Sequence, residues 1–139
     1  MMENDQKGQI SVELILLLGV IFVIVIVIAT QVGLQTESNK IAVSAKEGAL
    51  QALANQAIIN RNFAPNTVRT IKMTGSPNVI VVMNLSQPLS GSEYGYVLNN
   101  TYSYIQAQGF VRRGLGTPTD YTDDYIETAQ KNYFIQFVW

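Results

Sequence analysis

The sequence predicts an α+β protein in which a long apolar N-terminal helix precedes a small, mostly antiparallel β-sheet head. Three observations predict this class. Leu14 to Ala29 contains no polar side chain, residues 40–59 carry polar side chains at helical spacing, and the later part alternates short apolar runs with Gly, Pro and Asn. With 139 residues, the chain is long enough for one folded domain besides the helix.

The composition excludes several classes of function. The chain has no cysteine, so disulfides and thiolate metal sites are excluded, and no histidine, which removes the commonest general base and metal ligand. We therefore expect no enzyme activity, no cofactor and no small-molecule substrate. The formal net charge of −1 without long charge runs gives no electrostatic footprint for nucleic-acid binding.

The first element is an apolar helix long enough to cross a membrane. At about 1.5 Å per residue, Leu14 to Ala29 spans roughly 24 Å, short of a hydrocarbon core about 30 Å thick. Ile10 and Val12 before the run, and Val32 and Leu34 after it, supply the missing length. In lipid the backbone must satisfy its own hydrogen bonds, so we predict that residues 10–34 form a helix despite many β-branched side chains.

Two ordinary explanations of this segment fit less well. A secretory signal peptide cut after Ala29 should have a positive N-terminal region, but Glu3 and Asp5 precede the single Lys7. A plain signal anchor explains the length of the segment but not the carboxylate of Glu13 at its start.

A motif at the start of the apolar run is more specific. Gln9, Ser11, Glu13 and Leu17 fit the pattern Q-x-S-x-E-x-x-x-L, and the pair Lys7-Gly8 comes directly before it. This N-terminus resembles the class III signal peptide of archaeal type IV pilin-like proteins. The resemblance covers about 25 residues and the general layout of the chain. It implies that a prepilin peptidase cuts between Gly8 and Gln9, so that residues 1–8 are a leader and the helix stays on the mature subunit.

The resemblance also implies a role for Glu13 in assembly. In that family this acid is thought to meet the positive N-terminal amine of its own or a neighbouring subunit, which would set the axial register together with Gln9 and Ser11. In a low-dielectric bundle such a pair is far stronger than in water. A simpler alternative is that Ser11 is the N-cap and Glu13 stabilises the first helical turn.

The helix is expected to continue to residue 61, with residues 37–59 amphipathic. One narrow polar sector gathers Lys40, Ser44, Glu47, Gln51 and Asn55, and the remaining apolar arc is wider than the roughly 100° that a surface helix needs. Such an arc suits a helix with two partners, its own domain and neighbouring subunits. Residues 60–66 are polar and include Pro65, so we place the boundary of a β-rich head, residues 62–139, there.

Within the head we predict strands at Thr67–Thr74 and Asn78–Leu85 around Gly75-Ser76-Pro77, the second covered on both faces. A hairpin is predicted from Tyr94 to Ile105 around Asn99-Asn100, and a last strand at Tyr133–Trp139. Residues 124–131 stay ambiguous between a helical turn and part of a hairpin.

Two kinds of candidate site lie in the head. Asn84 and Asn99 each begin an N-x-S/T triplet, the acceptor signal for N-glycosylation. Four acidic residues crowd one short stretch and are weak candidates for a hard cation such as Ca²⁺: Asp120, Asp123, Asp124 and Glu127. Their spacing matches no EF-hand loop, and a solvated acidic loop is the favoured interpretation, so no metal is expected.

Together these observations predict a structural subunit of an archaeal type IV pilus-like filament. It would be a cytoplasmic-membrane precursor, trimmed after Gly8, that forms a helical homo-oligomer on the cell surface, where adhesion is the usual role by family analogy. A minor or priming subunit or an archaellin remains an alternative within the class. The alternative outside it is a single-pass, membrane-anchored binding module that never polymerises.

Overall fold

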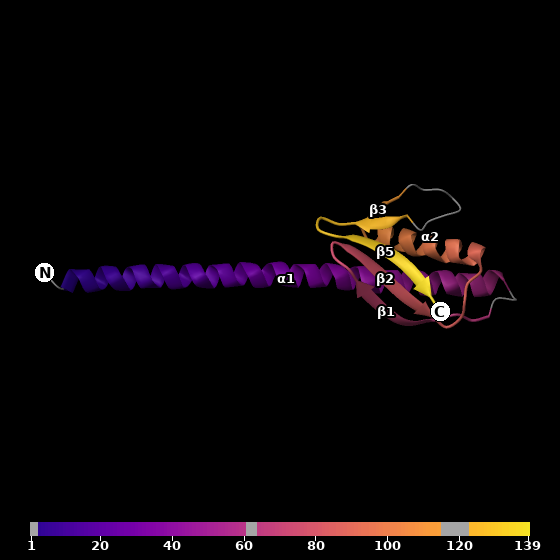
Figure 1. Ribbon diagram of the computed structural model, residues 1–139, viewed down its shortest axis with the longest axis horizontal. Helices are drawn as coiled ribbons and strands as arrows, with labels where there is room; N and C mark the ends of the chain where they lie inside the picture. The colour runs from indigo at the N-terminus through magenta and orange to yellow at the C-terminus, as the bar shows by residue number, and fades with distance from the viewer. Residues whose placement is uncertain (1–2, 61–63, 115–122) are drawn as a thin grey trace. The chain divides into compact units, whose positions relative to one another are not determined.

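The structure is a computed structural model that describes residues 3–60, 64–114 and 123–139, with side chains from Val12 onward (Figure 1). The chain divides into two compact units, Met1–Asn39 and Lys40–Trp139. The first helix, α1, runs from Glu3 to Ile59 and belongs to both units. The predicted long helix is therefore confirmed. It begins before Gln9 in this untrimmed chain, and it ends at Ile59 rather than residue 61.

The second unit contains a five-stranded sheet in the order β1-β2-β5-β4-β3. The strands are β1 (Val68–Thr74), β2 (Asn78–Leu85), β3 (Val111–Arg113), β4 (Tyr125–Glu127) and β5 (Asn132–Val138). The β1–β2, β3–β4 and β4–β5 pairings are antiparallel, whereas β2 and β5 run parallel. The sheet is thus mixed, although most of its pairings are antiparallel as predicted. The ambiguous residues 124–131 contain β4 and the turn into β5.

The turn between β1 and β2 lies where Gly75 and Pro77 predicted it. Gly75 has a φ of +98°, and a Cβ atom placed there would lie 2.2 Å from the carbonyl oxygen of Asn78. Only glycine fits such a position without strain. This residue therefore fixes where the chain reverses and, with it, the register of the first strand pair.

The hairpin predicted from Tyr94 to Ile105 is wrong, because this segment lies within a helix, α2 (Gly91–Ala107). Ser90 and Glu93 form a capping box at its start, with the Ser90 N–H donating to Glu93 Oε2 over 2.8 Å. The buried residues follow a helical spacing, and they are Val97, Leu98, Thr101, Tyr102 and Ile105. The head is therefore less β-rich than predicted.

The core of the second unit lies between one face of the sheet and the two helices. Ile41, Ala45, Ala49, Ala52 and Leu53 of α1 share one buried cluster with the inward side chains of β2 and β5 and with α2. On the α2 side, Tyr94 meets the ring of Phe137 of β5 edge-on, with centroids 5.7 Å apart. The small side chains of α1 allow this close packing.

Among the described residues, the helices cover one face of the sheet, which corrects the expectation that β2 is buried on both faces. Val79, Val81, Met83 and Leu85 of β2 point into the core, whereas Ile80 is 40% exposed on the outer face. The continuous apolar run of β2 therefore supplies both the core and part of an open surface.

Candidate functional site

The processing motif lies within α1. Lys7, Gly8, Gln9 and Ser11 have helical backbone, and their side chains fall outside the described part of the structure. Since α1 begins at Glu3, Ser11 and Glu13 are interior helix positions in this chain, so Ser11 is not an N-cap here. Glu13 is exposed. Its pairing with an amine stays a prediction.

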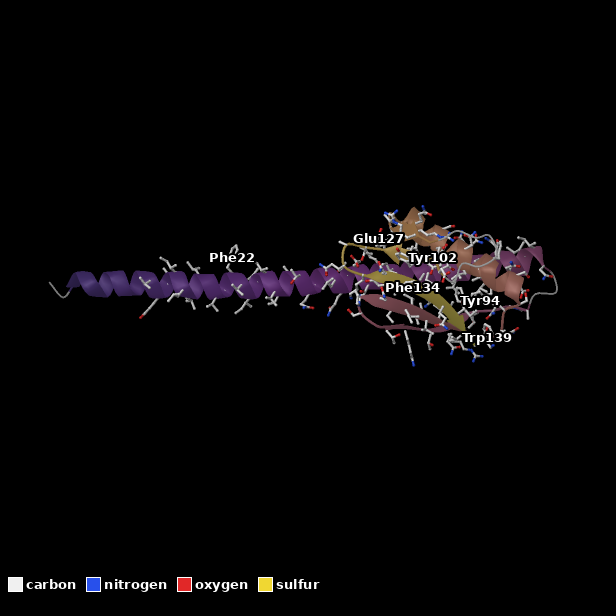
Figure 2. The ribbon with its side chains drawn as sticks, turned by 45° about the horizontal axis from the view of Figure 1, so that its top comes forward. Phe22, Tyr94, Tyr102, Glu127, Phe134 and Trp139 are labelled. Carbon is white, nitrogen blue, oxygen red and sulfur yellow. The ribbon has the colours of Figure 1, made fainter. Side chains whose placement is uncertain are left out.

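An apolar surface without cover surrounds the first unit. From Val12 to Ile28 the large apolar side chains are 48–70% exposed, and Phe22, at 70%, projects freely from the helix (Figure 2). The hydroxyl of Thr30 donates back to the carbonyl oxygen of Val27 over 2.8 Å, so it needs no outside partner. Within the described residues, α1 is the one helix that is long and apolar enough to cross a membrane.

A second apolar surface lies on the part of α1 that belongs to the head. Val43, Leu50, Ala54 and Ile58, here called the α1 stripe, recur at helical spacing and are exposed, Val43 by 56% and Ile58 by 78%, and the exposed side chain of Glu47 lies among them. The predicted polar sector differs in one member, because Ser44 is buried with 8% exposure. The wide apolar arc expected from the sequence is thus divided between a buried side and an open stripe.

The two glycosylation candidates lie in regular structure. Asn84 is the next-to-last residue of β2, and Asn99 lies on α2, where both are half-buried. The third residue of each triplet, Ser86 or Thr101, makes hydrogen bonds inside the fold.

The acidic candidates do not gather into a cation site. Asp120 lies outside the described residues, and Asp123 is exposed. Asp124 accepts hydrogen bonds from the guanidinium of Arg112, and Glu127 accepts one from Nε of Arg113 over 2.8 Å. Both carboxylates thus neutralise arginines, and among the described residues no three acidic side chains converge.

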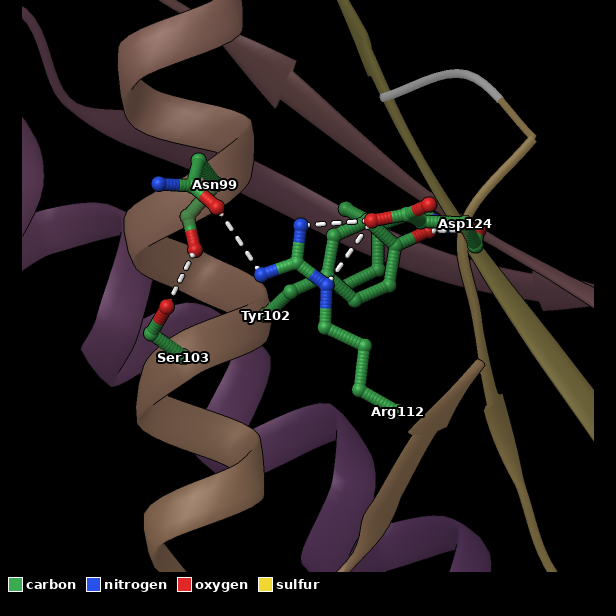
Figure 3. Close-up of polar contacts among 6 residues, drawn as sticks. Asn99, Tyr102, Ser103, Arg112 and Asp124 are labelled. Atoms are coloured by element: carbon green, nitrogen blue, oxygen red, sulfur yellow. Dashed lines mark hydrogen bonds and ion pairs between the residues drawn. The ribbon is translucent and has the colours of Figure 1, made fainter. Parts of the chain in front are cut away.

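Arg112 and Asp124 form a buried clamp that the sequence did not reveal (Figure 3). Arg112 donates through Nε to Asp124 Oδ2 over 2.8 Å and through Nη2 to the same atom, while its Nη1 donates to Asn99 Oδ1 over 2.8 Å. The guanidinium carbon lies 5.0 Å from the centroid of the Tyr102 ring. The side chain of Asp124 is 4% exposed and that of Arg112 16%. The pair of adjacent arginines, Arg112-Arg113, was the available signal in the sequence.

The hydroxyl of Tyr102 extends this clamp to the sheet. It donates to the carbonyl oxygen of Asp124 and accepts the N–H of Ile135 over 3.0 Å, so it joins α2, β5 and the segment before β4. Burial raises the pKa of Tyr102 well above its ordinary value, because a phenolate would lose its water here. The fixed hydrogen bonds between buried groups of α2, β3 and β5 indicate a structural role for the clamp.

Comparison with protein-family models, with curated proteins and with solved structures gives no match for this chain. The processing motif, the two uncovered apolar surfaces and the clamped head are therefore the observations from which a function has to be argued.

Proposed function

We propose that the chain is a structural subunit of an archaeal type IV pilus-like surface filament. In this proposal a prepilin peptidase cuts between Gly8 and Gln9, the membrane helix leaves the bilayer, and subunits assemble into a helical homo-oligomer through α1. The filament would serve attachment to surfaces. The subunit would contribute packing and a stable outer domain rather than chemistry.

The observation that carries the proposal is that α1 exposes more apolar surface than a helix needs in order to cross a membrane. The span from Val12 to Ile28 would be satisfied by lipid alone, and so would fit any anchored protein. The α1 stripe is different, because it belongs to the head and leaves side chains such as Leu50 and Ile58 open to water. Large apolar side chains exposed along one side of a helix favour an interaction site there.

Neighbouring copies of α1 are the cover that suits both surfaces. Burying a Val, Leu or Ile side chain completely contributes about 1.5–3 kcal/mol, so a helix bundle gains from every exposed apolar position of α1. Ala54, among the larger side chains of the stripe, permits close approach of another helix. The motif from Gln9 to Leu17 supports this use of the helix, because its resemblance is to subunits that assemble in this way.

The identity of the mature N-terminus tests the processing step. We expect the first residue of the protein isolated from its own cells to be Gln9. Thr30 as the first residue would mean ordinary secretion. An intact Met1 or Met2 would support the alternative, a membrane-anchored binding module that does not polymerise.

A substitution in the α1 stripe tests the assembly step separately. Leu50→Glu places a charge on the stripe, and we expect it to remove filaments from sheared cell-surface fractions without changing the N-terminus. Asn55→Glu is the matched control, since it adds the same charge at an exposed position of the same helix that belongs to the polar sector rather than the stripe. Equal filament yield from the two variants would contradict assembly through this surface.

A further inference from the structure

In the folded head, the hydroxyl of the third residue of each N-x-S/T triplet is engaged in hydrogen bonds within the protein. The hydroxyl of Ser86 donates to Asn66 Oδ1 over 2.8 Å and accepts the N–H of Thr67 over 3.0 Å. Thr101 is fully buried, and its hydroxyl donates to the carbonyl oxygen of Val97 over 2.7 Å. Because the hydroxyl of the third residue is part of the acceptor signal, a transferase cannot read either triplet in the finished fold.

The two asparagines nevertheless differ in whether the fold can hold a sugar. Oδ1 of Asn99 is held by Nη1 of Arg112 within the clamp (Figure 3). An N-linked sugar is joined through a planar amide, and the preferred trans geometry places its first carbon on the same side as the amide oxygen. A glycan on Asn99 would therefore crowd the guanidinium that binds Asp124.

Asn84 lies on the open side of the sheet. Leu85 next to it points into the core, so the strand alternation directs the Asn84 side chain to the outer face, opposite α1 and α2. Its cross-strand neighbours are Thr70 on β1 and Val138 on β5. A glycan here extends over the outer face and shields the exposed Ile80, which shares that face, without displacing a core residue.

We propose that Asn84 is N-glycosylated on the translocated chain before the head folds, and that Asn99 stays unmodified in the folded protein. This inference rests on the proposed function only in placing the head outside the cell. The co-reactant is an oligosaccharide linked through phosphate to a lipid. Asn84 Nδ2 forms a bond to the anomeric carbon of the sugar, the bond from that carbon to phosphate oxygen breaks with its electron pair on the lipid phosphate, and a base of the transferase takes one Nδ2 proton.

Site occupancy in the full chain tests the proposal directly. The protein is produced in a cell that N-glycosylates its own surface proteins, and intact glycopeptides are measured by mass spectrometry for wild type, Asn84→Gln and Asn99→Gln. We expect the wild type and Asn99→Gln to carry glycan at Asn84, and Asn84→Gln to carry none. Glycan at Asn99 in the folded protein, or none at Asn84, would overturn the proposal. The N-terminal peptide in the same data reports cleavage at Gly8, so failure of processing is seen separately.

A second experiment tests the order of modification and folding. Unglycosylated full-length protein, folded in detergent, is incubated with a purified transferase and its lipid-linked oligosaccharide, beside synthetic peptides of residues 80–90 and 95–105. We expect both peptides to be modified and the folded protein to be modified at least tenfold more slowly at both positions. Modification of the folded protein at the rate of the peptides would show that the triplets are open and would overturn the order.

Discussion

Replacing Arg112 by methionine should destabilise the head far more than the same replacement of Arg113, its neighbour on β3. Arg112 lies in a buried pair with Asp124, and these side chains are 16% and 4% exposed. Arg113 lies in a surface pair with Glu127, where the side chains are 60% and 44% exposed. The two variants therefore remove the same group from the same strand in opposite environments.

The expected magnitudes follow from burial. Removing one partner of a buried ion pair costs about 3–5 kcal/mol, because the other charge is left without compensation. We expect about 3 kcal/mol for Arg112→Met, since the guanidinium keeps some contact with water. An exposed pair contributes about 0.2–1 kcal/mol, which bounds Arg113→Met. For a domain of this size 1 kcal/mol shifts Tm by about 4–8 °C, so the expected losses are about 12–24 °C and less than about 8 °C.

The assay is thermal unfolding of the full chain in detergent, followed by near-ultraviolet circular dichroism of the tyrosines and Trp139. A double variant, Arg112→Met with Asp124→Asn, tests the cause, because it also removes the uncompensated carboxylate. The Tm of the double variant should be several degrees higher than that of Arg112→Met alone. Equal losses from the two single variants, or no recovery in the double variant, would refute the argument that the cost comes from a buried charge.

Three further substitutions have defined outcomes. Gly48→Ala should cost about 1 kcal/mol net in the same thermal assay, because its Cβ would lie 2.8 Å from Tyr104 Cβ, and overpacking outweighs the gain in helix propensity. Gly33→Ala, with nothing within 4 Å, is the control and should cause no loss. Tyr102→Phe should lower stability by about 1–3 kcal/mol at neutral pH through its lost hydrogen bonds. The pKa of Tyr102 is higher in the folded state than in the unfolded state, so the wild type should lose stability as pH rises above about 10, where the unfolded phenol ionises. Thermal unfolding measured between pH 8 and 11 should therefore show a smaller loss of stability with rising pH in Tyr102→Phe than in the wild type. Glu13→Gln should leave cleavage after Gly8 intact and reduce filament yield, and a normal yield would exclude a role for its charge in register.

Much of the fold could be predicted from local sequence, but α2 could not. The tyrosines at 94, 96, 102 and 104 alternate as they would on a strand, and tyrosine is common in sheets. The competing signal was the helical spacing of Val97, Thr101 and Ile105, preceded by the capping box of Ser90 and Glu93. Two periodicities overlapped in one segment, and the core that α2 packs on decided between them.

The clamp could not be predicted for a different reason. Arg112 and Asp124 are 12 residues apart in the sequence, and Asp124 was interpreted as part of a solvated acidic loop. Their meeting depends on the pairing of β3 with β4, which places Arg112 opposite Ile126 and brings the segment before β4 to the guanidinium. The parallel pairing of β2 with β5 likewise depends on the return of the chain through α2, β3 and β4.

Arg112 and Arg113 join β3 to β4 in a chain that has no cysteine for a disulfide. β3 and β4 are only three residues long, and so short a pair of strands holds together weakly through its backbone alone. A small domain often fastens such a segment with a disulfide or a metal, and this chain has neither cysteine nor histidine. Arg112 and Arg113 instead tie β3 to residues at both ends of β4, one through a buried pair and one through a surface pair.

The same charges bear on how copies of the chain can meet. The two edge strands of the sheet are β1 and β3, and β1 carries two exposed cationic side chains, Arg69 and Lys72, whereas the exposed Arg113 of β3 pairs with Glu127. Charged side chains on an edge strand such as β1 resist the edge-to-edge pairing of sheets that leads to uncontrolled association. The exposed apolar side chains of α1 carry no such protection, which is consistent with the proposal that copies of the chain meet through this helix.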